Sequence, residues 1–199
     1  MGYFSGAGLL LIDLQNDFLH EKGAYGRNDC SSPLVASVVS RVLPLVEAFK
    51  KHNGLVLASQ FTLIPDTNGT PLIEEKLKNL RPFLGKGDFA PQSWGHDIVD
   101  EIREAVDFKV EKVAYSAFYQ TRLEFVLRKK QISKLFVAGI VTNGGVASTV
   151  RDAHTRGFST HLVADGCGAF KEEVHRVTCD SLSHLVNVTV VEQLLANIS

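Results

Sequence analysis

Short apolar runs alternate along the chain with stretches in which apolar residues recur at helical spacing. The apolar runs have the length of strands that are buried on both faces, and the amphipathic stretches have the single apolar stripe of a packed helix. Strands are predicted over residues 8–13, 55–61, 108–111, 134–139, 160–164 and 187–191. Helices are predicted over residues 33–53, 97–106, 121–130, 146–153 and 172–185, with a short helix at the end of the chain.

This alternation predicts the fold class. Strands that alternate with helices form a parallel sheet with helices on both faces. We therefore expect an α/β protein: a three-layer α/β/α sandwich around a six-stranded parallel sheet, Rossmann-like in architecture. No internal repeat, low-complexity tract or linker indicates a second domain, so residues 1–199 are expected to form one domain.

Three helix starts carry recognisable sequence signals. Ser32 followed by Pro33 predicts an N-cap and the first helical position after it. Thr121 with Glu124 three residues later matches a capping box. Asn143 is expected to cap the helix that follows the fourth strand.

Polar residues occur where the predicted strands end. Asp13 ends the first strand, Gln60 lies near the end of the second, and Lys112 follows the third. A turn containing Gly145 follows the fourth strand, and Asp165 follows the fifth. Ligands of open parallel sheets bind beyond the carboxyl ends of the strands. We therefore expect these groups to converge on one rim of the sheet.

The turn at Gly144 and Gly145 joins a buried strand to a helix. Backbone N–H groups at a helix start have no partner within the helix, and the helix dipole adds partial positive charge there. A carbonyl oxygen, a carboxylate or a developing oxyanion would be stabilised at that point. The alternative is that the two glycines merely allow a tight turn. A second functional segment is predicted over residues 62–96, a long polar stretch with four prolines.

Asp13 and Lys112 are the candidate acid–base pair. A carboxylate and a lysine at one rim can act as a general acid or base and its electrostatic partner, provided that their strands lie close together. Considered singly, Asp13 could be a loop or cap residue and Lys112 a solvated surface lysine. Cys167 is a further candidate nucleophile, although no histidine is patterned beside it, and a small buried thiol is the simpler interpretation.

Composition limits the class of partner. The formal net charge is −1 and the charges are interspersed, so nucleic acid or an anionic membrane is not expected as the main partner. The expected partner is a small molecule. No apolar run has membrane-spanning length and the first residues lack a signal-peptide pattern, so a cytoplasmic protein is expected. Three cysteines without metal-ligand spacing indicate neither a disulfide framework nor a zinc site.

Four motifs together resemble the isochorismatase-like hydrolase superfamily, which includes cysteine hydrolases. They are LLLIDLQNDFL with Asp13, VEKVAYSAFYQTRLEFVL with Lys112, GIVTNGGVASTVRDA with Gly145, and ADGCGAF. The resemblance covers essentially the whole chain. In the amide-hydrolysing branch of this family a cysteine nucleophile stands where this chain has Gly145. The Asp-x-His metal pattern of nicotinamidases is replaced here by residues 59–61, Ser-Gln-Phe, so no metal and no other cofactor is expected.

The true isochorismatases resemble this sequence more closely at the glycine position, at Gln60 and in the run from Lys112 to Phe118. The resemblance implies that Asp13 protonates the vinyl ether of a small carboxylated substrate, that Lys112 tunes Asp13, and that Gln60 orients the substrate. It also implies a cis peptide bond before Val141, which would aim N–H groups of Val141 and Gly145 into one anion site. The substrate contacts expected from the family motifs are Phe18, Gln60, Tyr115, Phe118, Val141 and Gly144.

Three hypotheses follow. The first is vinyl-ether hydrolysis of the isochorismate type by Asp13 and Lys112, without a covalent intermediate. The second is a catalytically silent or diverged relative that binds a small acid or a protein partner through the same rim. The third is an amidase that uses Cys167 as its nucleophile. Family relatives are commonly oligomers, so a homodimer or homotetramer is expected.

Overall fold

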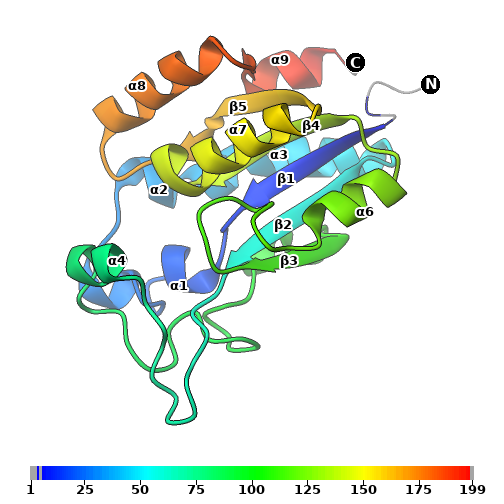
Figure 1. The fold of residues 1–199 in the computed structure, drawn as a ribbon. Helices are drawn as coiled ribbons and strands as arrows, with labels where there is room; N and C mark the ends of the chain where they lie inside the picture. Colours follow the sequence, from blue (N-terminus) through cyan, green and yellow to red (C-terminus); the bar gives the residue numbers. More distant parts are fainter. Residues whose placement is uncertain (1–3, 5, 198–199) are drawn as a thin grey trace.

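A computed structural model describes residue 4 and residues 6–197, and it contains a six-stranded parallel sheet (Figure 1). The strands lie in the order β3-β2-β1-β4-β5-β6. Every neighbouring pair is parallel, so the predicted six-stranded parallel sheet is confirmed. Their bounds are β1 Ala7–Ile12, β2 Leu55–Phe61, β3 Phe108–Lys112, β4 Lys134–Ile140, β5 Ser159–Gly168 and β6 Asn187–Thr189.

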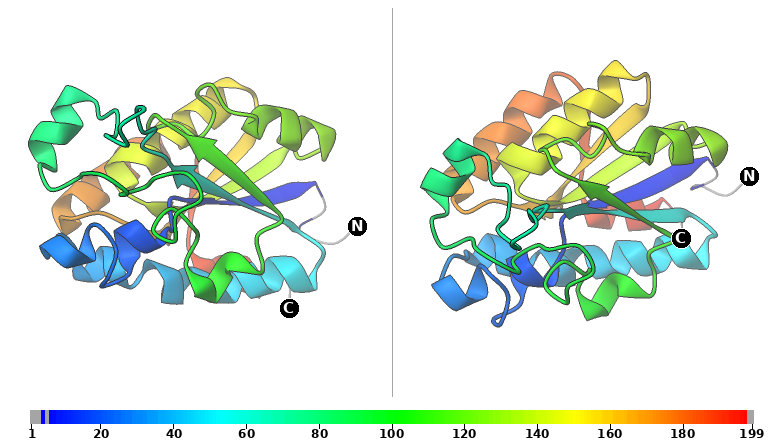
Figure 2. Two further views of the ribbon diagram at one scale, coloured as in Figure 1. Left: turned by 90° about the horizontal axis from the view of Figure 1, so that it is seen from below. Right: turned by 60° about the horizontal axis from the view of Figure 1, so that its bottom comes forward.

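Helices cover both faces of the sheet (Figures 1 and 2). One face packs against α2 (Pro33–Ala36), α3 (Val38–Lys51), α5 (Asp100–Arg103) and α9 (Val191–Ala196). The other packs against α6 (Leu123–Lys129), α7 (Ala147–Thr155) and α8 (Glu172–Ser183). Successive residues of β1 enter opposite cores, because Leu9 and Leu11 face α3 while Leu10 and Ile12 face α7. This arrangement is the predicted three-layer sandwich.

Two helix starts differ from the sequence prediction. The Thr121 hydroxyl accepts from the backbone N–H of Leu123, and not from that of Glu124, so no capping box forms. Asn143 is not an N-cap, because the chain already winds into a π-helical turn, η2, over Thr142–Val146 and continues into α7. Ser32 does cap α2, since its hydroxyl accepts from Val35 N–H, with Pro33 as the first helical residue.

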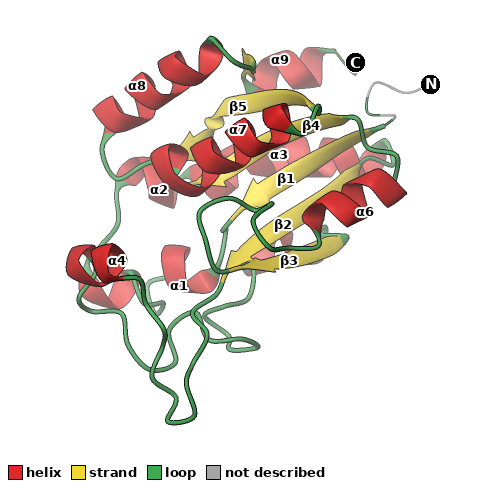
Figure 3. Cartoon of the chain, viewed as in Figure 1, coloured by secondary structure: helices red, strands yellow, loops and turns green. Residues whose placement is uncertain are grey.

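Other differences concern element lengths (Figure 3). The helix predicted over residues 33–53 is interrupted at Ser37, and α5 is shorter than the stretch 97–106. The strand β6 ends at Thr189 because the chain turns there into α9. The segments expected to be polar loops contain three short helices, namely α1 (Asn16–Leu19), the 3₁₀ helix η1 (Gly26–Asn28) and α4 (Glu75–Leu80). No helix among the described residues is long and apolar enough to cross a membrane.

The long connection between β2 and β3 packs against the connection that follows β1, beyond the carboxyl ends of the strands (Figure 1). Gln15 ties them together, because its side-chain Nε2 donates to the carbonyls of Phe61 and His96 and its Oε1 accepts from Phe61 N–H. An aromatic cluster of Phe18, Tyr25 and Phe89 fills the space between the two connections. These two connections therefore pack together along one side of the rim of the sheet.

Candidate active site

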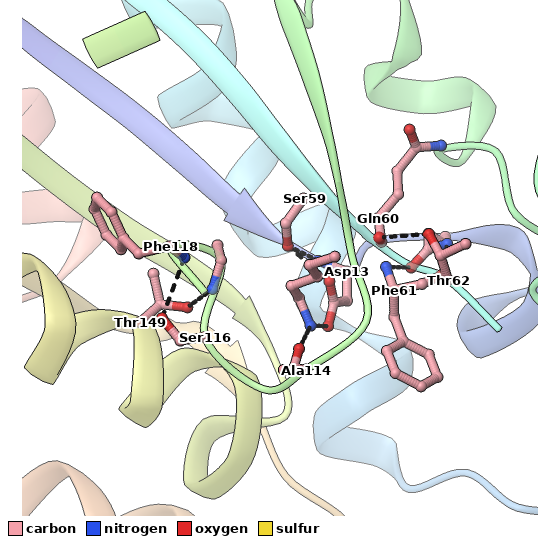
Figure 4. A network of polar contacts seen from close by, with 12 residues as sticks. Asp13, Ser59, Gln60, Phe61, Thr62, Ala114, Ser116, Phe118 and Thr149 are labelled. Carbon is pink, nitrogen blue, oxygen red and sulfur yellow. Dashed lines mark hydrogen bonds and ion pairs between the residues drawn. The ribbon is translucent and has the colours of Figure 1, made fainter. Parts of the chain in front are cut away.

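Asp13 is the first residue after β1 and adopts a left-handed backbone conformation, with φ of 56°. Aspartate tolerates this region better than most residues because its short polar side chain can hydrogen-bond locally. The Ser59 hydroxyl, from β2, donates to Asp13 Oδ1 at 2.6 Å (Figure 4). The backbone N–H of Asp13 donates to the Ser59 carbonyl at 3.2 Å. One serine thus fixes both the backbone and one carboxylate oxygen of Asp13.

Lys112 ends β3 and meets the other carboxylate oxygen. Its Nζ lies 2.7 Å from Asp13 Oδ2 and donates to the Ala114 carbonyl at 3.0 Å. The register of the sheet makes this possible, because Ser59 pairs with Ile12 and Phe61 pairs with Lys112. The expectation that strand ends bring Asp13 and Lys112 together is confirmed.

The pair is removed from solvent, with Asp13 5% and Lys112 3% exposed. A buried ion pair needs further hydrogen bonds to offset the cost of removing two charges from water. Ser59 supplies one for the carboxylate and the Ala114 carbonyl supplies one for the ammonium group. Lys112 is therefore not the solvated surface lysine of the alternative interpretation, and Asp13, although it lies in the loop after β1, is buried in an ion pair.

The turn after β4 lies directly against Asp13. The Ile140–Val141 peptide bond is cis, as the resemblance implied, and η2 follows it. Gly145 is buried, and a Cβ at this position would lie 3.3 Å from Asp13 Oδ2 and 3.0 Å from Ile12 Cγ2. The oxygen of Asp13 that meets Lys112 is therefore also the one that faces Gly145.

A second glycine allows β4 to approach β1 this closely. Gly139 has φ of 122°, and a Cβ there would lie 2.3 Å from the Ile12 carbonyl oxygen. Any side chain at this position would collide with the backbone just before Asp13. Gly139 is thus required for the approach of the turn to the carboxylate.

Three of the predicted substrate contacts, Tyr115, Val141 and Gly144, lie at the turn. A Cβ on Gly144 would meet Val141 Cγ2 at 3.1 Å and Tyr115 Cδ1 at 3.4 Å. Tyr115 is 60% exposed, which leaves most of its ring available to a ligand. Tyr115, Val141 and Gly144 therefore form one continuous surface next to Gly145.

Gln60 is not brought into this site. Side chains alternate along a strand, and Ser59 and Phe61 both approach the Asp13–Lys112 pair, with Lys112 Nζ 5.4 Å from the Phe61 ring centroid. Gln60 points away from Asp13 (Figure 4), and its Nε2 donates to the His96 carbonyl at 2.8 Å. Gln60 is 5% exposed, and its hydrogen bond to His96 fixes the long loop to the end of β2.

Three other candidate residues lie outside this constellation. Phe118 is buried in the core with Phe158. Phe18 belongs to the aromatic cluster, 6.2 Å from Phe61 between ring centroids, and borders the site only through that ring. Asp165 does not join the rim, because β5 continues past it and its carboxylate accepts from Val191 N–H at the start of α9.

Cys167 lies fully buried in β5, and burial raises the pKa of its thiol. A thiol without solvent access and with a raised pKa is a poor nucleophile. The interpretation of Cys167 as a small buried thiol is confirmed. Among the described residues no three His, Cys, Asp or Glu side chains gather closely enough to hold a metal ion.

Ser59 is the functional residue that sequence reasoning overlooked. The signal was present, because a serine inside an otherwise apolar strand, two residues before the strand's end, needs a hydrogen-bond partner when buried. The resemblance directed attention to its neighbour Gln60 instead. Ser59 is fully buried, and Asp13 is its partner.

The α/β sandwich, with its buried Asp–Lys pair and the Gly145 turn at one rim, is consistent with the hydrolase class that the family comparison shows. A model of the isochorismatase domain matches residues 7–193, and the chain belongs to this hydrolase family.

The chain is also similar to individual proteins of known name. The isochorismatase family protein YecD from Escherichia coli O157:H7 is 37% identical over 191 residues, covering 94% of this chain and 93% of YecD. Nicotinamidase 3 from Arabidopsis thaliana is 28% identical over 180 residues, covering 89% of this chain and 80% of that protein. The crystal structure of a cysteine hydrolase from Pseudomonas syringae pv. phaseolicola 1448A matches with a TM-score of 0.81 at 20% identity, covering 96% of this chain and 92% of that one.

Proposed function

We propose that the protein hydrolyses the vinyl ether of a small carboxylated substrate of the isochorismate type, with Asp13 as the general acid. The observation that carries the proposal is the position of Asp13 Oδ2, which meets Lys112 Nζ at 2.7 Å and faces the side-chain-free Gly145. A side chain at position 145 would occupy the space beside this oxygen. Glycine leaves that space to substrate.

The reaction balances with these groups and one water. In this reaction the ion pair first takes up one proton from solvent at Asp13, which then transfers it to the terminal carbon of the vinyl ether, and the ether carbon becomes an oxocarbenium ion. Water adds to that carbon, and the resulting hemiketal collapses to pyruvate and an alcohol. The proton released from water restores Asp13, so the enzyme is unchanged.

Lys112 and Ser59 control which carboxylate oxygen reacts. The Ser59 hydroxyl occupies Oδ1, which leaves Oδ2 as the oxygen that faces the turn. Lys112 lies beside Oδ2 and stabilises the carboxylate that forms when the proton leaves. The N–H groups of the turn and the exposed ring of Tyr115 would hold the substrate carboxylate and its planar part.

Amide hydrolysis is the activity that the name of the Arabidopsis relative denotes. In this chain the group next to Asp13 Oδ2 is Gly145, which offers no atom to add to an amide carbon. Cys167, the buried thiol, lies within β5. These two features favour hydrolysis without a covalent intermediate over amidase chemistry.

The test is pyruvate release from isochorismate by the purified protein, run beside Asp13→Asn. Pyruvate released by the wild type and lost in a folded Asp13→Asn variant is the expected result. A variant that retains turnover would exclude Asp13 as the acid. A wild type that releases no pyruvate would exclude isochorismate as the substrate.

The second candidate function is binding without turnover. The observation that favours it is the burial of the acid–base pair, since Asp13 and Lys112 are 5% and 3% exposed. Calorimetric titration with isochorismate distinguishes the two functions. Saturable binding without any pyruvate after prolonged incubation would support a silent binder.

A further inference from the structure

A partly buried side-chain hydrogen bond ties the turn over residues 141–145 to α8. Thr142 is the first residue of η2 and is fully buried. Its Oγ1 lies 2.9 Å from Nδ1 of His175, a half-buried residue in the first half of α8. Neither residue was singled out by its sequence pattern, because they are 33 positions apart.

The first half of α8 contains no fully buried side chain among the described residues. Leu182, near the end of the helix, is its one buried side chain among the described residues. The N-cap residue Lys171 makes no side-chain capping hydrogen bond. Cys179 lies one helical turn after His175, with its sulfur 3.8 Å from Nε2, and so packs beside the ring. The hydrogen bond between His175 and Thr142 is therefore a specific polar link between α8 and the turn.

We infer that His175 is a positioning residue that sets the geometry of the turn over residues 141–145 through the hydroxyl of Thr142. The helix α7, which continues the turn, is anchored on its other side by Thr149, whose hydroxyl accepts from the Ala117 N–H at 2.9 Å (Figure 4). Loss of the His175 contact would release one of these two anchors. The N–H groups of the turn would then lose their fixed position relative to Asp13 Oδ2.

The charge state of His175 governs the direction of this hydrogen bond. Burial lowers the pKa of the ring below its ordinary value of 6.5, Arg41 of α3 lowers it further, and Glu172 on α8 opposes the change. A neutral ring can accept the Thr142 hydroxyl proton at Nδ1. A protonated ring can only donate at Nδ1, so the buried hydroxyl proton would have to find another acceptor.

The first experiment does not depend on turnover. In ¹⁵N-labelled protein, the amide resonances of Gly144 and Gly145 are followed from pH 7.5 downwards beside the ring resonances of His175. We expect the amides to shift with the midpoint of the His175 ring. Thr142→Val, which keeps the shape and removes the hydroxyl, should abolish that response, and Thr142→Ser should retain it.

Controls decide between positioning and a general effect of pH. His184→Asn removes an exposed histidine at the end of the same helix and should leave the Gly144 and Gly145 titration unchanged. If the amide resonances of Gly144 and Gly145 in the wild type do not shift as His175 titrates, the inference is overturned. The same response in wild type and Thr142→Val would overturn it as well.

The second experiment rests on the proposed function and uses isochorismate. His175→Phe keeps a ring and removes Nδ1, and we expect KM to rise about fivefold to tenfold, the usual effect of losing one buried hydrogen bond. His175→Asn, whose amide can occupy the position of Nδ1, should restore most of the affinity. An unchanged KM in a folded His175→Phe protein would contradict positioning. If the wild type releases no pyruvate, the proposed function fails while the amide titration still decides the role of His175.

Discussion

The Asp13 carboxylate and the Lys112 ammonium group meet at 2.7 Å although their strands are not neighbours in the sheet. β2 lies between β1 and β3, and it contributes Ser59 to the same carboxylate. Three adjacent strand ends therefore supply the Asp13 carboxylate, its hydrogen-bond donor and its counter-charge. The fourth, β4, supplies the turn that faces them.

Removal of the Lys112 charge should destabilise the protein strongly. Lys112→Met leaves the buried Asp13 carboxylate without its counter-charge, and we expect a loss of about 3–5 kcal/mol in the free energy of unfolding. Lys109 on the same strand pairs with Asp97 where both side chains are about one-third exposed. Lys109→Met should therefore cost less than about 1 kcal/mol. Urea unfolding measures both, and equal losses would contradict the buried-pair interpretation.

Substitution of Ser59 should mainly lower activity, whereas substitution of Gln60 should mainly lower stability. Ser59→Ala removes the donor to Asp13 Oδ1, and we expect pyruvate release to fall by about tenfold or more, as for a hydrogen bond to a charged group. Gln60→Ala removes a buried hydrogen bond to the His96 carbonyl, so it should lower the unfolding midpoint while KM stays within twofold of wild type, about the error of such an assay. A larger change of KM in Gln60→Ala than in Ser59→Ala would restore Gln60 as the substrate contact.

The two close glycines should respond differently to alanine. Gly145→Ala places a methyl group 3.3 Å from Asp13 Oδ2, which a small shift can accommodate, so we expect a folded protein with about tenfold or more lower activity. Gly139→Ala adds a collision with the Ile12 carbonyl at 2.3 Å to a backbone strain of about 1–3 kcal/mol. Circular dichroism and thermal unfolding should show that Gly139→Ala is far less stable. A folded, fully active Gly145→Ala would contradict the proposed role of the open space.

Stability should fall in mild acid because of buried histidines. Burial lowers the pKa of His96, His161 and His175 below their ordinary value of 6.5. As the pH falls through about 6.5, these histidines take up protons in the unfolded chain, whereas in the folded protein their rings stay neutral to a lower pH. The stabilising effect of neutral rings is complete above about pH 7 and is lost towards pH 5. Urea unfolding at several pH values should show a shallower decline in His96→Gln, whereas the exposed His154→Gln should follow the wild type.

The sheet and the identity of the acid–base pair could be predicted because both depend on local patterns. Apolar runs specify strands, and parallel strands bring their carboxyl ends to one edge, so the sequence placed Asp13 and Lys112 on one rim, while their pairing depended on the strand order. The direction of a side chain near a strand end depends on register by a single residue. Gln60 was predicted from the resemblance as a substrate contact, whereas it is Ser59, one residue earlier, whose side chain reaches Asp13. The hydrogen bond between Thr142 and His175 joins segments that are distant in the sequence, so no local pattern predicts it.

The register that joins Ser59 to Ile12 and Lys112 to Phe61 has a consequence for folding cooperativity. β3 is an edge strand of five residues, and edge strands of this length would ordinarily open independently of the sheet centre. Opening of β3 here would withdraw Lys112 and leave a buried carboxylate unpaired next to the central strand β1. The amide protons of β3 that hydrogen-bond to β2 should therefore exchange with solvent at nearly the rate of global unfolding, and the charge of Lys112, which we propose serves the reaction, would also protect this edge of the sheet.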